Sequence, residues 1–433
     1  MANRRDALAA RREAMGFTQQ SFAIRLRVEL STVGRWERGT LTPQPWRRPQ
    51  IAAALGVSLE QLDKLLTVSA AAESDGAQAV AGSGEPNADV RFDCTSIADD
   101  ARDAARFARQ VSDARISRAS LEQISVKVRR FATDYVSQPL SELFVDVREL
   151  RGDVFHLVES NRFPDQMRDL YLAASRLSGL QAHICLDLGY YRAARTHADT
   201  AFLCAELAGN NGMRAWVRGL QSLIAYWDGQ LEEAVEFARD GSRYCGHGSV
   251  AARLPSLEAR ACAARGDARG ALAALERGER ARAVVGADDD DAGVFTFPAA
   301  KQAVYAGTTL LALGDRATAA RAVQESSSAL QLYAAAPPAD RSTGDMLAAR
   351  LDLGRAYLMQ DDLDGMTEQL RIVLATPQVR RTASIIKRAA GIGKSLGRTR
   401  YAHSPQAREI SREIAAFCAP PPALPPLPTP EMT

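Results

Sequence analysis

Aromatic residues are scarce in this chain, at 6% of 433 residues, whereas alanine is abundant. Strands favour aromatic and β-branched side chains and disfavour alanine, so this composition favours packed helices over a β-sandwich. The length is too great for one helical module and indicates two or more domains. An apolar share of 46% is sufficient for their cores, so we expect a globular protein.

Cysteines are few, and none stands in a C-x-x-C motif. The six occupy positions 94, 185, 204, 245, 262 and 418. In a reducing compartment such residues are small core side chains, not disulfides or a zinc knuckle. Cys245 and His247 form the one close cysteine–histidine pair, which is half of the tetrahedral set that zinc requires. We therefore predict no metal site.

Long apolar runs and catalytic signatures are also missing. No stretch is long enough to span a bilayer, and Met1–Arg5 leads into no signal-like apolar core, which predicts a cytoplasmic protein. The sequence has no G-x-S-x-G motif or P-loop, and its five histidines are widely spaced. The acidic run Asp288–Asp291 lacks the alternation of a calcium loop, so we interpret it as a mobile loop. Neither an enzyme nor a cofactor is predicted.

Residues 18–39 have the pattern of two short helices joined by a turn. The apolar edge of the two helices consists of Phe22, Ala23, Leu26, Val33 and Trp36. Ala23 is small, as the close crossing of a helix-turn-helix requires. Gly39 supplies the left-handed residue that ends the second helix. The pattern predicts a helix-turn-helix.

This stretch resembles the Cro/repressor-type (Xre-like) helix-turn-helix family, and the run to Leu66 looks like the N-terminal domain of large actinobacterial-type regulators. The residues in the family's register are Gln19, Ala23, Val33, Trp36, Glu37 and Gly39. The resemblance implies that the second helix lies in the major groove, with Leu30, Ser31 and Arg35 toward the bases. It implies phosphate contacts for several flanking residues. The full set expected at DNA is Arg12, Gln19, Leu30, Ser31, Thr32, Arg35, Arg38, Thr40 and Arg47.

Charge is concentrated at this end of the chain. Residues 1–66 contain eleven Lys and Arg against six Asp and Glu, although the whole chain carries only +2. Two residues depart from the family pattern. Arg27 stands where glycine is usual, and Glu29 heads the recognition helix, where it repels phosphate unless it accepts from cytosine N4.

The flanking pattern completes a five-helix domain over residues 1–66. Further helices are expected at residues 4–15, 50–55 and 58–66, the last capped by Ser58. Residues 67–96 carry no periodic apolar pattern and are interpreted as a flexible linker. Helical patterning fills residues 97–418. The proline-rich residues 419–433 are interpreted as a disordered tail, with a polyproline ligand as the alternative.

The long helical region repeats at intervals typical of helix pairs. One equivalent turn recurs roughly every 37–48 residues, at Gly189, Gly229, Gly266, Gly314 and Asp361. Small residues recur five positions after the turn and seven before it, at Ala194, Ala234, Ala271, Ala319, Ala182, Ser222, Ala259, Gly307 and Gly354. Antiparallel helices need small residues where their backbones approach, so five helix pairs are predicted over about 165–395. The longer interval before Gly314 predicts an insertion at 286–298.

The segment 353–361, Leu-Gly-Arg-Ala-Tyr-Leu-Met-Gln-Asp, resembles the tetratricopeptide (TPR) repeat. The resemblance implies a superhelix whose concave face is lined by the first helix of each pair. Counting back from each turn places these cations on that face: Arg176, Arg253, Arg260, Lys301 and Arg355. Tyr226 and Trp227 are nearby. We interpret the face as a groove for an acidic peptide or a small anionic molecule, with a solvated face of an arginine-rich chain as the alternative.

The predicted fold is all-α: a Cro/repressor-like helix-turn-helix domain followed by a TPR-like α-solenoid. The predicted function is that of a sequence-specific transcriptional regulator whose repeats sense a ligand, mediate dimerisation, or do both. Double-stranded DNA and a second copy of the chain are the predicted partners. The alternative is a protein-assembly adaptor, in which the repeats recruit a partner and the helix-turn-helix only localises the complex.

Overall fold

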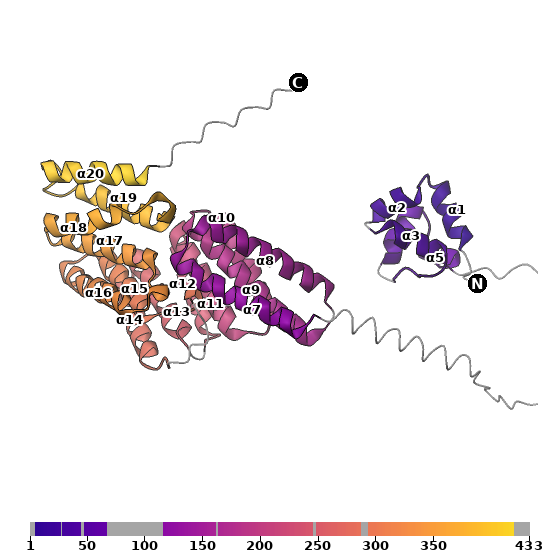
Figure 1. The fold of residues 1–433 in the computed structure, drawn as a ribbon, viewed down its shortest axis with the longest axis horizontal. Helices are drawn as coiled ribbons and strands as arrows, with labels where there is room; N and C mark the ends of the chain where they lie inside the picture. The colour runs from indigo at the N-terminus through magenta and orange to yellow at the C-terminus, as the bar shows by residue number, and fades with distance from the viewer. Residues whose placement is uncertain are drawn as a thin grey trace, which may run out of the picture. The chain divides into compact units, whose positions relative to one another are not determined.

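The computed structural model describes residues 5–26, 28–44, 47–66, 116–161, 163–245, 248–286 and 293–419. The chain divides into two compact units, Met1–Arg91 and Phe92–Thr433. Every regular element in the described ranges is a helix, which confirms the predicted all-α class (Figure 1). The predicted linker (67–96), residues 420–433 of the predicted tail, Arg27 and Asp288–Asp291 lie outside the described residues.

The first unit is built from five short helices around one apolar core. They are α1 (Asp6–Ala14), α2 (Gln19–Leu26), α3 (Leu30–Glu37), α4 (Arg48–Leu55) and α5 (Leu59–Leu66). All five residues predicted for the core of the motif are buried, and Leu55 and Leu62 join them there. Gly39 has a φ of 74°, as its predicted turn requires. Ser58 caps α5 by accepting from the Gln61 N–H at 3.1 Å.

The second unit, here called the array, is a succession of packed helices (Figure 1). It comprises α7 (Arg118–Ser137), α8 (Leu140–Ser160), α9 (Pro164–Asp187), α10 (Tyr191–Leu207), α11 (Asn211–Asp228), α12 (Leu231–Ser242), α13 (Val250–Ala264), α14 (Ala268–Ala283), α15 (Ala299–Leu313), α16 (Arg316–Ala335), α17 (Thr343–Met359), α18 (Leu363–Leu374), α19 (Ala383–Leu396) and α20 (Pro405–Cys418). The predicted five pairs correspond to α9/α10 through α17/α18. Helices α7 and α8 precede them, and α19/α20 form a further pair.

The predicted turns and crossing points are both observed. The four glycines of the equivalent turn have φ between 83° and 88°, and Asp361 has 66°, the one positive φ of a non-glycine in the described part of the chain. Ala194, Ala234, Ala271 and Ala319 are 0% exposed, each packed between the helices of its pair. At Gly307 a Cβ atom would lie 2.6 Å from Ser326 Oγ. These contacts confirm the helix-pair repeat.

Curvature of the array brings helices that are distant in sequence into contact. Helix α19 packs against α9, where a Cβ atom on Gly189 would lie 3.3 Å from that of Ala383. Lys387 Nζ in α19 donates to the Trp227 carbonyl at the end of α11, at 2.9 Å. Arg388 Nη1, also in α19, lies 2.6 Å from Asp352 Oδ1 of α17. Helix α19, near the end of the array, therefore contacts the first two helix pairs.

The end of the predicted insertion is a buried part of the array. In residues 293–298, which include the 3₁₀ turn η2 (Gly293–Phe295), the side chains of Val294, Phe295 and Phe297 are buried. Trp216 Nε1 donates to the Val294 carbonyl at 3.2 Å, and η2 packs against α7. This η2 segment (293–298) is therefore held between α7 and α11.

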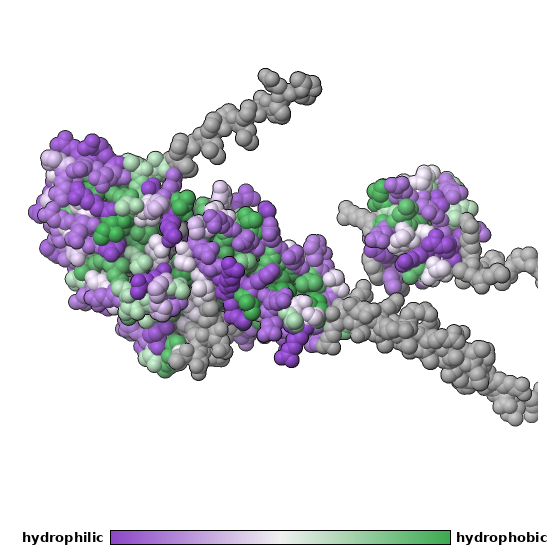
Figure 2. Space-filling model, viewed as in Figure 1, coloured by the Kyte–Doolittle hydropathy of each residue, from purple (hydrophilic) through white to green (hydrophobic). Residues whose placement is uncertain are grey.

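The surface of the array is mixed in character. On the face drawn in Figure 2, hydrophilic residues cover most of it, with smaller hydrophobic patches among them. Among the described helices, none combines the length and the apolar character that crossing a membrane requires.

Trp36→Ala should unfold the first unit while the array keeps its own melting transition. Trp36 is 3% exposed, and a core of five short helices cannot absorb a loss of about 3–5 kcal/mol. Differential scanning calorimetry of the full chain measures both transitions. Ile24→Ala is the matched control, because Ile24 in α2 is 72% exposed and its truncation should leave both transitions in place. Loss of both transitions together in Trp36→Ala would contradict two independent units.

Candidate DNA-binding surface and ligand cavity

Helix α3 presents to solvent the residues predicted to face bases. Leu30, Ser31 and Arg35 are exposed, and Thr32 is half-buried. The opposite side of α3 is anchored in the core by Val33 and Trp36. Because the anchoring and the exposed residues alternate along one rigid helix, the exposed set has a fixed geometry. This geometry is what reading base edges in a major groove requires.

Arg12 corrects the predicted set of phosphate contacts. Its side chain is buried, its Nε donates to Glu37 Oε1 at 2.6 Å, and its Nη1 donates to the Phe17 carbonyl at 2.6 Å. Glu37 is 6% exposed and also accepts from Gln19 Nε2 at 2.6 Å. A buried carboxylate requires partners, and Arg12 and Gln19 supply them. Arg12 is therefore not at the surface for a phosphate contact, and the amide nitrogen of Gln19 is engaged within the domain.

The remaining predicted contacts lie around the ends of α3. Arg38 and Thr40 are exposed after its last turn, and the Thr40 hydroxyl donates to the Arg35 carbonyl at 3.2 Å. Arg47 Nη1 donates to the Leu26 carbonyl at 3.4 Å. Glu29, at the head of α3, accepts from the Ser31 hydroxyl at 3.3 Å. The Glu29 carboxylate therefore lies on the surface that would face DNA.

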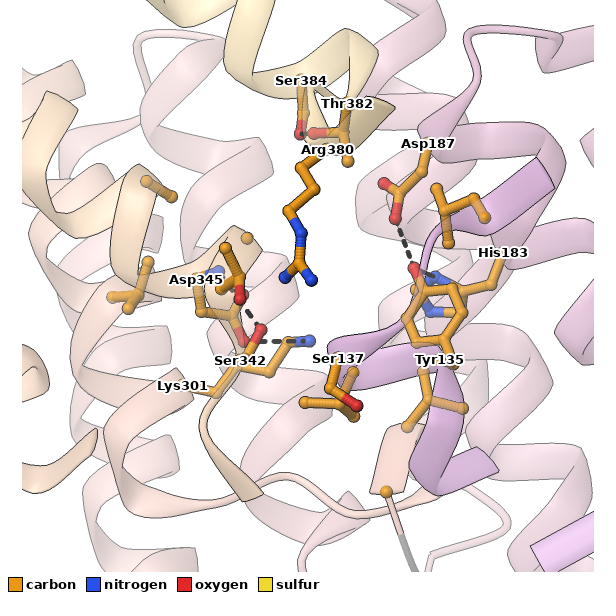
Figure 3. Close-up of a pocket in the computed structure, with 18 of the residues that line it drawn as sticks. Tyr135, Ser137, His183, Asp187, Lys301, Ser342, Asp345, Arg380, Thr382 and Ser384 are labelled. Carbon is orange, nitrogen blue, oxygen red and sulfur yellow. Dashed lines mark hydrogen bonds and ion pairs between the residues drawn. The ribbon is translucent and has the colours of Figure 1, made fainter. Parts of the chain in front are cut away.

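A cavity of about 930 Å³ lies on the inner side of the array (Figure 3). It is lined from the first helices α9, α11, α13, α15, α17 and α19 of the pairs, and also from α7, the start of α8 and the end of α16, together with the η2 segment and the turns before α17 and α19. The first helices of the pairs thus form much of its wall, but α16, the second helix of its pair, contributes as well. The contacts of α19 with α9 and α11 close the array beside this cavity.

Two polar clusters face each other across the cavity (Figure 3). On one side, the Tyr135 hydroxyl donates to Asp187, and His183 Nδ1 lies 3.0 Å from the same hydroxyl. On the other side, Lys301 Nζ lies 3.4 Å from Asp345 Oδ2. Tyr333 also donates to Asp345, at 2.8 Å. Each carboxylate of the two clusters is therefore already paired within the protein.

Burial controls the protonation of the first cluster. It raises the pKa of Asp187 to about 6, although the Tyr135 hydrogen bond and Lys301 act in the opposite direction. It lowers the pKa of His183 well below its usual value, and the charges of Arg253 and Lys301 add to this effect. His183 is therefore neutral at neutral pH. In the second cluster burial disfavours the Lys301 ammonium, but Asp345, Tyr305 and Asp187 together outweigh burial and raise the pKa of Lys301.

The five cations predicted for one groove do not share one. Arg260 and Lys301 line the cavity. Arg253 is 3% exposed beneath it and donates to the Trp216 carbonyl at 2.8 Å, and Arg176 lies over the Phe295 ring at 5.5 Å. Arg355 is exposed on α17 and does not line the cavity. The η2 segment explains part of the difference, because Phe295 covers Arg176 and packs on Trp216, against which Arg253 lies.

Residues 5–65 match the family model of a helix-turn-helix domain. The match covers the five helices of the first unit almost completely. No curated protein matches the chain. The helix-turn-helix domain, with its exposed α3, supports a DNA-binding regulator. It is followed by the helical-repeat array, which the family model does not cover.

A recurring turn motif identifies cavity residues that the repeat pattern missed. Pro337-Pro338-Ala339-Asp340-Arg341-Ser342 recurs forty residues later as Pro377-Gln378-Val379-Arg380-Arg381-Thr382. In both copies the second-last residue, Arg341 or Arg381, donates from Nε to the carbonyl just before the first proline. In both, the last residue caps the next helix. The residue just before that arginine, Asp340 or Arg380, lines the cavity.

Asp187→Asn should stabilise the array at neutral pH and not at acid pH. With a folded pKa of about 6 against the usual 3.8, the stability that protonated Asp187 contributes is complete below about pH 4 and lost as pH rises through 6. Asparagine still accepts from Tyr135, so the variant should gain about 1–2 kcal/mol at pH 7.5. Melting temperatures at pH 4.5 and 7.5 measure the effect, with exposed Asp340→Asn as the control. An equal gain at both pH values would show that the charge of Asp187 is not its cause.

Proposed function

We propose that this protein is a cytoplasmic, sequence-specific transcriptional regulator. Helix α3 of its helix-turn-helix domain reads base edges, and the array is a TPR-type receptor domain that binds a ligand. Two copies of the chain act together, which raises the effective concentration of the second DNA-binding domain once the first is bound. The array binds its ligand without transforming it.

The exposed face of α3 carries the DNA-binding part of the proposal. Arg35 offers a planar fork that suits guanine O6 and N7, and Leu30 offers an apolar surface for a thymine methyl group. The internal Arg12–Glu37–Gln19 network adds rigidity, because it ties α1, α2 and α3 together through buried hydrogen bonds. A rigid helix with exposed polar residues favours recognition of the base sequence over non-specific binding to the DNA backbone.

The cavity favours a receptor over the adaptor alternative. Adaptors of this architecture bind extended segments along an open concave face. Here α19 packs on α9 and α11 beside that face, and a cavity of about 930 Å³ remains inside. Volumes of this size are typical of small-ligand sites. A ligand that contacts both α19 and the helices on which α19 packs would bias how the array bends. It would thereby change the spacing of two DNA-binding domains.

Arg35→Ala should weaken binding to a selected operator by about 1–3 kcal/mol and change binding to random duplex little. The reason is that a base contact is specific to one site, whereas a phosphate contact acts on all DNA. Fluorescence anisotropy of the full chain with both duplexes, at one fixed salt concentration, measures the two affinities. Lys64→Ala is the matched control, because Lys64 lies on α5, which packs on α1 and α4, and it pairs with Glu60. Equal losses of Arg35→Ala on both duplexes would place Arg35 on the phosphate backbone only.

A further inference from the structure

We infer that the array cavity binds a small organic acid, whose acidic group pairs with Arg260 and whose apolar body lies against Trp227 and Tyr305. The inference deepens the receptor part of the proposed function and rests on it. It specifies the chemical class of the ligand and the residues that select it.

Arg260 is a buried cation whose contacts are aromatic. Its side chain lines the cavity and is 3% exposed, and its Nε is buried without a hydrogen-bond partner. The guanidinium carbon lies 4.3 Å from the centre of the Tyr305 ring and 4.6 Å from that of Tyr226, with Trp227 at 5.8 Å. The faces of aromatic rings attract a cation, but they do not accept the strong hydrogen bonds that an anion accepts from a guanidinium group. A buried arginine in this state is prepared for an acidic ligand.

Three of the other four cations that line the cavity already have partners. Lys301 pairs with Asp345, and Arg388 pairs with Asp352 and donates to Thr308 Oγ1 at 3.1 Å. Arg381 donates to the backbone carbonyls of Thr376 and Phe417. Asp187, the carboxylate of the first cluster, accepts from Tyr135. The carboxylates of both clusters are thus occupied, and neither is left to neutralise Arg260.

Arg380 adds a second positive charge to the lining of the cavity. It extends from the turn η4 (Gln378–Arg380) toward the space between the Asp345 and Asp187 clusters (Figure 3). Among the cavity-lining residues, five are cationic and three are carboxylates, so the lining carries a surplus of positive charge. This surplus attracts an anion into the cavity and orients it, because opposite charges at short range act strongly where water is excluded.

The shape of the site favours a compact molecule over a peptide chain. Leu223, Trp227, Val304 and Tyr305 supply apolar and aromatic lining near Arg260. A cavity of about 930 Å³ is within the range of small-molecule sites. The Lys387 contact with Trp227 closes the array beside this lining, which favours a compact ligand over an extended strand. An acidic group on a planar or aliphatic body fits both the charge and the walls.

The test uses two dyes of nearly equal shape and different charge. The full-length chain is titrated with 1-anilinonaphthalene-8-sulfonate, an organic acid, and with N-phenyl-1-naphthylamine, which lacks the sulfonate. Fluorescence should report one site for the acid, competed by indole-3-acetate and not by penta-glutamate. Arg260→Met, which keeps an apolar stem, should weaken the acid about tenfold or more and the neutral dye less than threefold. Arg355→Gln is the matched control, because Arg355 is exposed outside the cavity, and it should bind both dyes as the wild type does.

Arg380→Gln keeps the inference open to refutation if Arg260→Met does not fold. Arg380 is on an exposed turn, so the variant should keep the array's melting transition and still weaken the acid about threefold. Unchanged affinity for the acid in folded Arg260→Met, or in Arg380→Gln, would overturn the inference, and so would tighter competition by penta-glutamate than by indole-3-acetate. Because the titration contains no DNA, such a failure would leave the DNA-binding proposal standing.

Discussion

The close approach of the two helices in each pair is the constraint on which the array depends. Alanines that are 0% exposed, or glycines such as Gly307, stand where the backbones approach, and a left-handed turn residue joins each pair. A larger side chain at these points would separate the helices and change the angle between successive pairs. The sum of those angles determines whether α19 meets α9. The cavity is therefore a consequence of small residues that do not line it.

The same constraint explains which features of the structure could be predicted from the sequence. Turn residues and crossing alanines are local and periodic, so the five turns, the pairs and the core of the first unit were predictable. The packing of α19 on the first pairs was not predictable from the sequence. Lys387 contacts Trp227, and Arg388 contacts Asp352, only because the curvature of the successive pairs adds up along the array. The roles of single residues were harder to predict than the fold. Arg12 and Arg35 look alike in a sequence, yet one is buried against Glu37 and the other is exposed on α3.

In the described part of the chain, the buried arginines other than Arg260 are paired with a carboxylate or a carbonyl. Arg12 has Glu37, and Arg253, whose pKa burial lowers to about 10, donates to the Trp216 carbonyl. The half-buried Arg388 likewise pairs with Asp352. Arg260 departs from this rule, since its described contacts are aromatic rings. Local rules of folding are most often broken where a protein has a function to perform. The departure at Arg260 thus supports the ligand site that we infer, as the exposure of α3 supports the DNA-reading surface that we propose.

Retention of genomic fragments tests the central claim, sequence reading by the helix-turn-helix domain, most directly. The purified full-length chain is mixed with sheared chromosomal DNA of its source organism near physiological salt, and the retained fragments are sequenced. We expect a small set of fragments with a common motif, arranged as two half-sites one helical turn or a multiple of it apart. Uniform retention of all fragments, or none even at low salt, would contradict a sequence-specific regulator.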